Sequence, residues 1–203
     1  MQQRCVVLDI GGVLEFTPDT GWPGRWERRL GLPAGAVDER LADVWHAGSV
    51  GTIDETAVRS EVAARLGLDA AGADALLGDL WTEYLGTPNT ELIAYVGELR
   101  GRCGLGILSN SFAGARERES AAYGFDTLVD QLHYSHETGL LKPDPRAYEA
   151  VCAALGASPG DCLFVDDFPP NIEAARAAGL PAHLFEDNPA TLTRIAAHVG
   201  PAV

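Results

Sequence analysis

Four short runs of apolar residues recur along the chain, and each run ends at polar, glycine or proline residues. Continuous apolar runs of this length are typical of strands that are buried on both faces. The first run leads directly to Asp9, and the others lead to the segments SNS, DDFPPN and EDNPA. The pattern predicts four buried strands with polar side chains at their carboxyl ends, over residues 4–8, 105–108, 162–165 and 182–185.

Segments with helical periodicity separate these strands, over residues 90–99, 145–155 and 171–178. Gly156 and Gly179 directly follow the last two segments, at the position where glycine commonly ends a helix. This alternation predicts an α/β fold, a Rossmann-like parallel sheet with helices on both faces. Ligands bind to such a sheet at the carboxyl ends of its strands, which is where the polar residues fall.

The stretch from residue 16 to residue 86 departs from the alternation. It contains no convincing strand but four helical segments, over residues 22–30, 37–45, 54–66 and 70–84. Because it leaves the sheet just after Asp9 and returns before Thr90, its natural position is above the strand ends. We therefore expect a core of residues 1–15 and 87–203, with residues 16–86 forming a small α-helical cap inserted after the first strand.

Composition and run lengths favour a globular protein of the cytoplasm. Of the 203 residues, 46% are apolar and 22% are charged, close to the average of soluble domains. No apolar run approaches the roughly 20 residues that a membrane-spanning helix needs. The run near the N-terminus is also too short for a secretory signal, so we expect a cytoplasmic protein with no membrane partner.

Charge and cysteine spacing narrow the possible partners further. The formal charge of −14 opposes binding to nucleic acid or to an anionic membrane, since both require a surplus of lysine and arginine. A phosphate ester is compatible with this charge if a metal ion and a lysine make the site itself positive. The four cysteines include no Cys-x-x-Cys pair, so we expect buried, reduced thiols and a metal held by oxygen ligands.

Two strand ends carry residues that are suited to binding an anion. Asp9 is followed by Gly11 and Gly12, whose missing side chains allow backbone groups to approach a small anion or a metal. Ser109 and Asn110 follow the second predicted strand, where a hydroxyl and backbone N–H groups can hold phosphoryl oxygens. Taken singly, Asp9 has the alternative interpretation of a helix cap or a turn residue, and Ser109 that of a helix N-cap.

A lysine and an acidic pair complete the candidate chemistry. Lys142 lies in the segment GLLKPDP, where the prolines restrict the backbone. A lysine held in this way can neutralise a carboxylate nucleophile and a phosphoryl group together. Asp166 and Asp167 are adjacent carboxylates after a strand, which is a costly arrangement without a cation. Mg²⁺ would satisfy them together with Asp9.

The segments LDIGGVL, ILSN, LKPDP and FVDDFPPNIEAARAAG follow one another in the order of the four sequence motifs of the haloacid dehalogenase superfamily. The resemblance spans the chain and includes an insertion between the first two motifs. Within the superfamily the chain resembles members with a small helical cap, near the sugar-phosphate phosphatases and the N-terminal phosphatase domain of soluble epoxide hydrolases. This resemblance implies a Mg²⁺-dependent phosphatase that acts on a small phosphorylated metabolite through an aspartyl-phosphate.

The resemblance also implies a role for each matching residue. Asp9 would attack phosphorus and Lys142 would orient and neutralise this nucleophile. The phosphoryl group would bind at Ser109, Asn110, Gly11 and Gly12. The metal would be held by Asp9, Asp167, the main-chain carbonyl of Gly11 and, directly or through water, Asp166. Asn171 would shape the loop that carries the acidic pair.

One position departs from the family pattern. Phosphatases of the family usually carry a second Asp two residues after the nucleophile, as an acid and base, where this chain has Gly11. A positioned acid and base contributes roughly 10²- to 10⁴-fold to a rate. Either Glu15, Asp19 or His46 replaces it, or the leaving group needs no proton, or the enzyme is slow. As alternatives, Glu15 and Asp19 are exposed carboxylates in a mobile loop, and His46 is an ordinary cap residue.

Two rival functions and one ambiguous group of residues stay open at this level. A haloacid dehalogenase would attack carbon and need no metal, and the pair Asp166 and Asp167 counts against it. A phosphate-binding or scaffolding protein would retain the ligand but turn it over negligibly. Trp22, Trp26 and Trp45 either line a substrate pocket or form the cap's own core.

Overall fold

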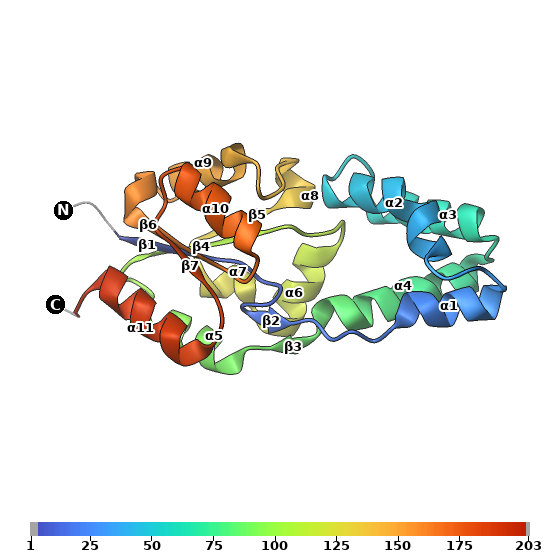
Figure 1. The fold of residues 1–203 in the computed structure, drawn as a ribbon, viewed down its shortest axis with the longest axis horizontal. Coiled ribbons are helices and arrows are strands. Elements are labelled where there is room, and N and C mark those ends of the chain that lie inside the picture. The colour runs from blue at the N-terminus through green and yellow to red at the C-terminus, as the bar shows by residue number, and fades with distance from the viewer. Residues whose placement is uncertain (1–3, 202–203) are drawn as a thin grey trace.

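The computed structural model describes residues 4–201 and contains a five-stranded parallel sheet in the order β5-β4-β1-β6-β7 (Figure 1). The strands are β1 (Cys5–Leu8), β4 (Gly104–Ser109), β5 (Gln131–Tyr134), β6 (Cys162–Asp166) and β7 (Ala182–Leu184). The predicted α/β class is therefore confirmed. β5 is absent from the sequence prediction because its residues QLHY form no apolar run. It is an outer strand of the sheet, and its first three residues are half-buried.

Helices cover both faces of the sheet, because successive residues of a strand point to opposite sides. One face is covered by α5 (Thr90–Glu98) and α11 (Asn188–Val199), the other by α9 (Pro145–Ala154) and α10 (Pro169–Ala177). In β1, Val6 and Leu8 pack into the first layer, whereas Cys5 and Val7 pack into the second. The shorter elements are α6 (Ala115–Tyr123), α7 (Phe125–Leu128), α8 (Ser135–Thr138) and a 3₁₀ turn at Pro159–Asp161.

Four further helices lie beyond the carboxyl end of β1, on the side of the molecule away from both termini (Figure 1). They are α1 (Trp22–Leu30), α2 (Ala36–Ser49), α3 (Glu55–Leu66) and α4 (Ala70–Leu85). Their apolar faces form a separate cluster in which Val37, Leu41 and Val58 are fully buried. Phe112 and Ala115, which follow β4, belong to the same cluster. This helical insertion is thus packed against the segment that follows β4.

A short antiparallel ladder joins the helical insertion to the sheet. Its strands are β2 (Glu15–Phe16) and β3 (Thr87–Pro88). The sequence pattern predicts no strand there, since two residues per strand are too few to establish a period. The ladder holds the segment that enters the insertion beside the segment that leaves it, so the insertion begins and ends at the same place in the fold.

The interior contains reduced thiols, and its helices are of ordinary length. All four cysteines are buried and none of them forms a disulfide within residues 4–201, as their spacing predicts. They pack as small apolar residues within the two clusters beside the sheet. None of the helices within residues 4–201 combines the length and the apolarity that crossing a membrane requires.

Candidate active site

Three adjacent parallel strands deliver polar side chains to one edge of the sheet. β1 lies between β4 and β6, and Leu8 is paired with Ile107 on one side and Val165 on the other. Asp9, Ser109 and Asp166 therefore lie at the carboxyl ends of neighbouring strands. The N–H of Asp9 donates to the carbonyl of Val165 at 2.9 Å, which holds β1 and β6 together up to the carboxylate. Neither Asp9 nor Ser109 caps a helix, so the helix-cap interpretation of each residue is wrong.

Lys142 connects the two innermost carboxylates. Its ammonium lies 2.6 Å from Asp9 Oδ1 and 2.8 Å from Asp166 Oδ2, and its side chain is 1% exposed. The segment between α8 and α9 is held by Asn110, whose Nδ2 donates to the Lys142 carbonyl at 2.8 Å. In return, the Lys142 N–H donates to Asn110 Oδ1 at 2.7 Å. The Asn110 side chain is thus fully engaged with the lysine backbone, which leaves its main-chain N–H for a ligand.

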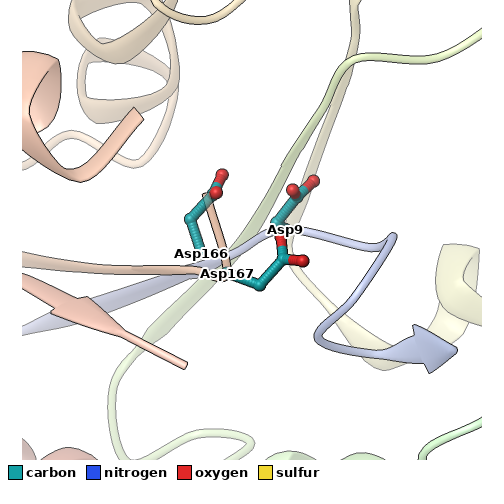
Figure 2. Close-up of side chains that lie close together, drawn as sticks. All are labelled: Asp9, Asp166 and Asp167. Atoms are coloured by element: carbon teal, nitrogen blue, oxygen red, sulfur yellow. The ribbon is translucent and has the colours of Figure 1, made fainter. Parts of the chain in front are cut away.

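The two acids of the pair differ in their surroundings. Asp166 is completely buried and accepts hydrogen bonds from Lys142, from the Phe168 N–H at 2.8 Å, and from Asn171 Nδ2 at 3.0 and 3.1 Å. Asp167 is exposed, and no lysine or arginine within residues 4–201 forms an ion pair with it. Figure 2 draws both acids with Asp9, and one oxygen of each lies within 4.8 Å of the others.

The charges at this edge do not balance. Burial raises the pKa of Asp9 to about 7, although the Lys142 ammonium acts in the opposite direction. Burial and the neighbouring Asp166 carboxylate also raise the pKa of Asp167. The three carboxylates have one ammonium beside them, and it pairs with only two of them. A cation placed among their oxygens would stabilise all three in the ionised form.

The two glycines after Asp9 have different functions in the structure. Gly12 has a φ of 74°, and a Cβ there would lie 2.0 Å from Asp167 Oδ2. Its N–H donates to the Glu15 carbonyl at 2.7 Å, so Gly12 makes room for Asp167 but has no free N–H for phosphate. A Cβ on Gly11 would meet nothing closer than Thr17 Oγ1 at 4.0 Å. The space that a second Asp would occupy is therefore open.

That space belongs to a cavity of about 170 Å³, here called the inner cavity. Its lining residues are Ile10, Gly11, Glu15, Thr17, Tyr84, Ser109, Asn110 and Glu119. Of the three residues considered as replacements for the missing acid, Glu15 is in this lining and is 2% exposed, so its interpretation as a mobile exposed residue is wrong. Asp19 is exposed and accepts from the Gly21 N–H at 3.0 Å, away from the inner cavity.

Glu119 is a wall residue of the inner cavity that sequence reasoning missed. It is 2% exposed and accepts a hydrogen bond from the Tyr134 hydroxyl at 2.5 Å. Burial raises the pKa of Glu119 to about 7, and it raises the pKa of Glu15 to about 7 as well. The segment RERE, which ends with Glu119, resembles a solvated helix face, and no signal in the sequence marks this last acid as buried.

A signal for Lys142, in contrast, is present in the sequence. It is the only lysine among 203 residues, in a chain with a formal charge of −14. The remaining candidates lie further out: His46, Trp22 and Trp45 line a larger cleft beside the helical insertion. Trp26 packs in the core of the insertion, where its Nε1 donates to Asp79 Oδ2 at 2.8 Å.

The fold and this site define an α/β protein with a carboxylate and lysine centre at the carboxyl edge of its sheet. A family model described as haloacid dehalogenase-like hydrolase matches residues 3–179. The chain therefore belongs to the haloacid dehalogenase-like hydrolase family, and the resemblance drawn from its four motifs is confirmed.

Relatives and solved structures agree with this assignment. The chain is 33% identical over 197 residues to the phosphatase MT3486 of Mycobacterium tuberculosis, covering 92% of this chain and 88% of that protein. It is 23% identical over 218 aligned residues to the bifunctional epoxide hydrolase 2 of Sus scrofa, covering 96% of this chain but 38% of that longer protein. A haloacid dehalogenase family enzyme of Bacteroides thetaiotaomicron, in a magnesium complex, has a TM-score of 0.77 at 19% identity, covering 96% of this chain and 100% of that one. This last similarity bears on the fold alone.

Proposed function

We propose that this hydrolase is a Mg²⁺-dependent phosphatase that removes phosphate from a small phosphorylated metabolite through an aspartyl-phosphate at Asp9. The observation that carries the proposal is the Lys142 ammonium, 2.6 Å from Asp9 and 2.8 Å from Asp166 in the protein interior. A carboxylate nucleophile and a phosphate dianion repel each other. A buried ammonium beside the nucleophile reduces this repulsion at the point where the new bond forms.

The donor set at the sheet edge fits a hard divalent cation. Asp9 and the exposed Asp167 would bind it directly, with the Gly11 carbonyl as a further ligand. Asp166 would act through water, because its oxygens already accept from Lys142, Phe168 and Asn171. When bound, Mg²⁺ would supply positive charge to the oxygens of the transferring phosphoryl group.

The phosphoryl group would bind at the inner cavity. Ser109 would donate from its hydroxyl, and Gly11 and Asn110 would donate from their main-chain N–H groups, since all three line this space. Gly12 is better assigned to the metal side, because its N–H is already bonded and its missing side chain accommodates Asp167.

In the proposed reaction an Asp9 oxygen bonds to phosphorus as the bond from phosphorus to the ester oxygen breaks. Water then attacks the aspartyl-phosphate at phosphorus, which releases inorganic phosphate and restores the carboxylate. The departing oxygen takes up a proton, and water loses one. Glu15 is the best placed of the three candidates for this proton transfer, because it lines the same cavity as Gly11.

Two alternatives make different demands on the site. A dehalogenase has no need for a cation among three carboxylates, so the spacing within 4.8 Å favours the phosphatase. A binding or scaffolding protein would keep Mg²⁺ and phosphate, and the absence of an acid at Gly11 is the observation that favours it. Phosphate release with Mg²⁺ distinguishes our proposal from both alternatives, because neither a dehalogenase nor a scaffolding protein would release phosphate efficiently.

The test is phosphate release from a panel of phosphorylated metabolites with Mg²⁺, with and without a chelator. We expect release that the chelator abolishes, and a loss of at least about 10³-fold in Asp9→Asn. Asp19→Asn is the matched control, since this carboxylate is exposed and lies outside the inner cavity, and it should retain wild-type rates. Wild-type turnover by Asp9→Asn would refute the mechanism. Binding of phosphate esters without release, even from an activated aryl phosphate, would favour the scaffolding protein.

A further inference from the structure

A larger cleft continues outward from the inner cavity and is here called the outer cleft. It has a volume of about 500 Å³ and lies between the helical insertion and the loop after β4. Thr17, Tyr84 and Asn110 line both spaces, so the two are neighbours. A group esterified to a phosphate in the inner cavity can therefore extend into the outer cleft.

The charged residues of the outer cleft are all acidic. Asp38 of α2 and Glu83 of α4 contribute carboxylates, and its twelve lining residues include no lysine or arginine. Nearby arginines are engaged elsewhere: Arg25 donates to the Thr20 carbonyl and pairs with Asp79, and Arg118 pairs with Glu55. The outer cleft is therefore a region of negative potential directly beyond the phosphate site.

The apolar wall of the outer cleft is built from aromatic rings in fixed contact. Phe112 meets Trp45 edge to face, with centroids 5.8 Å apart at 69°, and meets Trp81 at 6.1 Å. Gly48, within α2, allows this arrangement, since a Cβ there would lie 2.4 Å from the Phe112 ring. A glycine inside a helix destabilises that helix. Gly48 nevertheless occupies this position, because a larger residue would collide with the Phe112 ring where it packs on α2.

On the basis of the proposed function, we infer that the outer cleft receives the leaving group of the phosphate ester and selects an uncharged, ring-bearing alcohol or phenol. The aromatic wall offers ring edges and faces to such a group. A leaving group with a second phosphate or a carboxylate would meet Asp38 and Glu83 with no lysine or arginine in the lining to offset the charge. At an effective dielectric constant near 20, two like charges about 8 Å apart change an equilibrium constant by roughly 30-fold.

The charge selectivity is tested with phenyl phosphate and 4-carboxyphenyl phosphate at pH 8 with Mg²⁺. The two esters differ by one carboxylate, and the carboxylated phenol is the better leaving group, so intrinsic reactivity opposes the expected order. Allowing for solvent screening at the exposed Asp38, we expect kcat/KM to be at least about tenfold higher for phenyl phosphate. Equal values, or a preference for the carboxylated ester, would overturn the inference.

A charge reversal assigns the effect to the outer cleft. Asp38→Lys should raise the ratio of kcat/KM for 4-carboxyphenyl phosphate to kcat/KM for phenyl phosphate by about tenfold. Glu39→Lys is the matched control, because it makes the same change in net charge at the next, exposed residue of α2, outside the cleft. If both variants change the ratio of the two esters equally, the effect is one of net charge and the inference is wrong.

A binding measurement separates this inference from the proposed function. Asp9→Asn with Mg²⁺ is titrated calorimetrically with both esters, so no turnover is needed. At least tenfold tighter binding of phenyl phosphate supports the inference even if the wild-type protein hydrolyses neither ester, in which case only the proposed function fails. Similar dissociation constants for the two esters contradict it, whatever the turnover.

The contribution of the aromatic wall of the outer cleft is tested separately, by ligand binding to a Trp45 variant. In the Asp9→Asn background, Trp45→Ala should weaken phenyl phosphate binding by about tenfold, since the indole supplies contact area to the ring. Methyl phosphate, which does not reach the outer cleft, should bind within about twofold of its affinity without the Trp45 substitution. Equal weakening of both ligands would contradict recognition of a ring in the cleft.

Discussion

The inner site and the outer cleft differ in their chemical character. The inner site, consisting of Asp9, Asp166, Asp167 and Lys142, concentrates charge at the edge of the sheet, where one ammonium serves two carboxylates. The outer cleft is walled by aromatic rings, and its charged residues Asp38 and Glu83 are acidic. Lys142 is thus part of the inner site, whereas the described lining of the outer cleft contains no lysine or arginine.

The two regions are positioned by different parts of the chain. Buried strands hold the inner site, so its geometry follows from the sheet register and tolerates little change. Helices of the insertion and the loop after β4 hold the outer cleft, and their faces can change without altering the strand ends. The chemistry and the choice of leaving group are therefore separable by mutation, and the following predictions test that separation.

The largest expected effect is at the inner site. Lys142→Met leaves Asp9 and Asp166 buried without their cation, and removing one partner of a buried ion pair costs roughly 3–5 kcal/mol. We expect phosphate release to fall by at least about 10³-fold and the free energy of unfolding to fall by that amount, measured by urea titration.

The matched control is Arg146→Met, which removes a cation from the exposed pair between Arg146 and Asp144. Exposed pairs contribute little, so this variant should unfold close to the wild-type midpoint. If Lys142→Met were as stable and as active as Arg146→Met, the inner site would not depend on its lysine, and the contrast with the outer cleft would be lost.

Most of the inner site was accessible to prediction because parallel strands bring their carboxyl ends to one edge. Asp9, Ser109 and Asp166 follow predicted strands, so their proximity follows from the fold class alone. The different surroundings of Asp166 and Asp167 were not predicted, since two adjacent acids look equivalent in a sequence. They differ because β6 runs as far as Asp166, which makes that side chain part of the buried strand.

The second prediction concerns Glu119, which lines the inner cavity but not the outer cleft. Its pKa is raised to about 7 in the folded protein from an ordinary value of 4.5, so the folded state favours the protonated form. Its contribution is fully present below about pH 4.5 and is lost as pH rises through about 7, a change of roughly 3 kcal/mol. Glu119→Gln, which keeps the acceptor for Tyr134, should therefore be more stable than wild type by about this amount at pH 8 and similar near pH 4.

Urea unfolding of wild type and variant at both pH values measures this difference. Glu117→Gln is the control, since Glu117 is exposed on the same helix, and it should show no such pH dependence. A constant difference between Glu119→Gln and wild type across this range would mean that the carboxyl is not buried as described.

The outer cleft and the inner-cavity wall were largely beyond sequence reasoning. Trp22, Trp26 and Trp45 share one helical region, yet only Trp22 and Trp45 line the cleft, because helix packing rather than residue type decides which ring is covered. Glu119 lies in a charged helical segment that reads as solvated. Pairings between distant segments, such as Glu119 with Tyr134, leave no local pattern to detect.

A smaller effect is expected where the backbone makes room for the metal side of the inner site. Gly12→Ala places a Cβ at 2.0 Å from Asp167 Oδ2 and at a φ of 74°, which costs roughly 1–2 kcal/mol and displaces the carboxylate. We expect lower stability and an increase of about fivefold in the Mg²⁺ concentration for half-maximal rate. Gly11→Ala is the matched control for stability, because its Cβ meets no atom within 4 Å except Thr17 Oγ1 at that limit. Equal destabilisation by both variants would argue against this role for Gly12.

The last prediction adds the acid that the inner cavity lacks. Gly11→Asp places a carboxyl in open space beside Thr17, where it can protonate a leaving oxygen. We expect the release of phosphate from an alkyl ester such as ethyl phosphate to rise by about tenfold, because an alkoxide leaves poorly without a proton. Release from 4-nitrophenyl phosphate should change by less than about twofold, since that phenolate leaves unaided. An equal change for both esters would mean that the new carboxyl acts through the metal or the fold. No gain for the alkyl ester, together with a loss for that ester alone in Glu15→Gln, would instead mean that Glu15 already transfers the proton across the inner cavity.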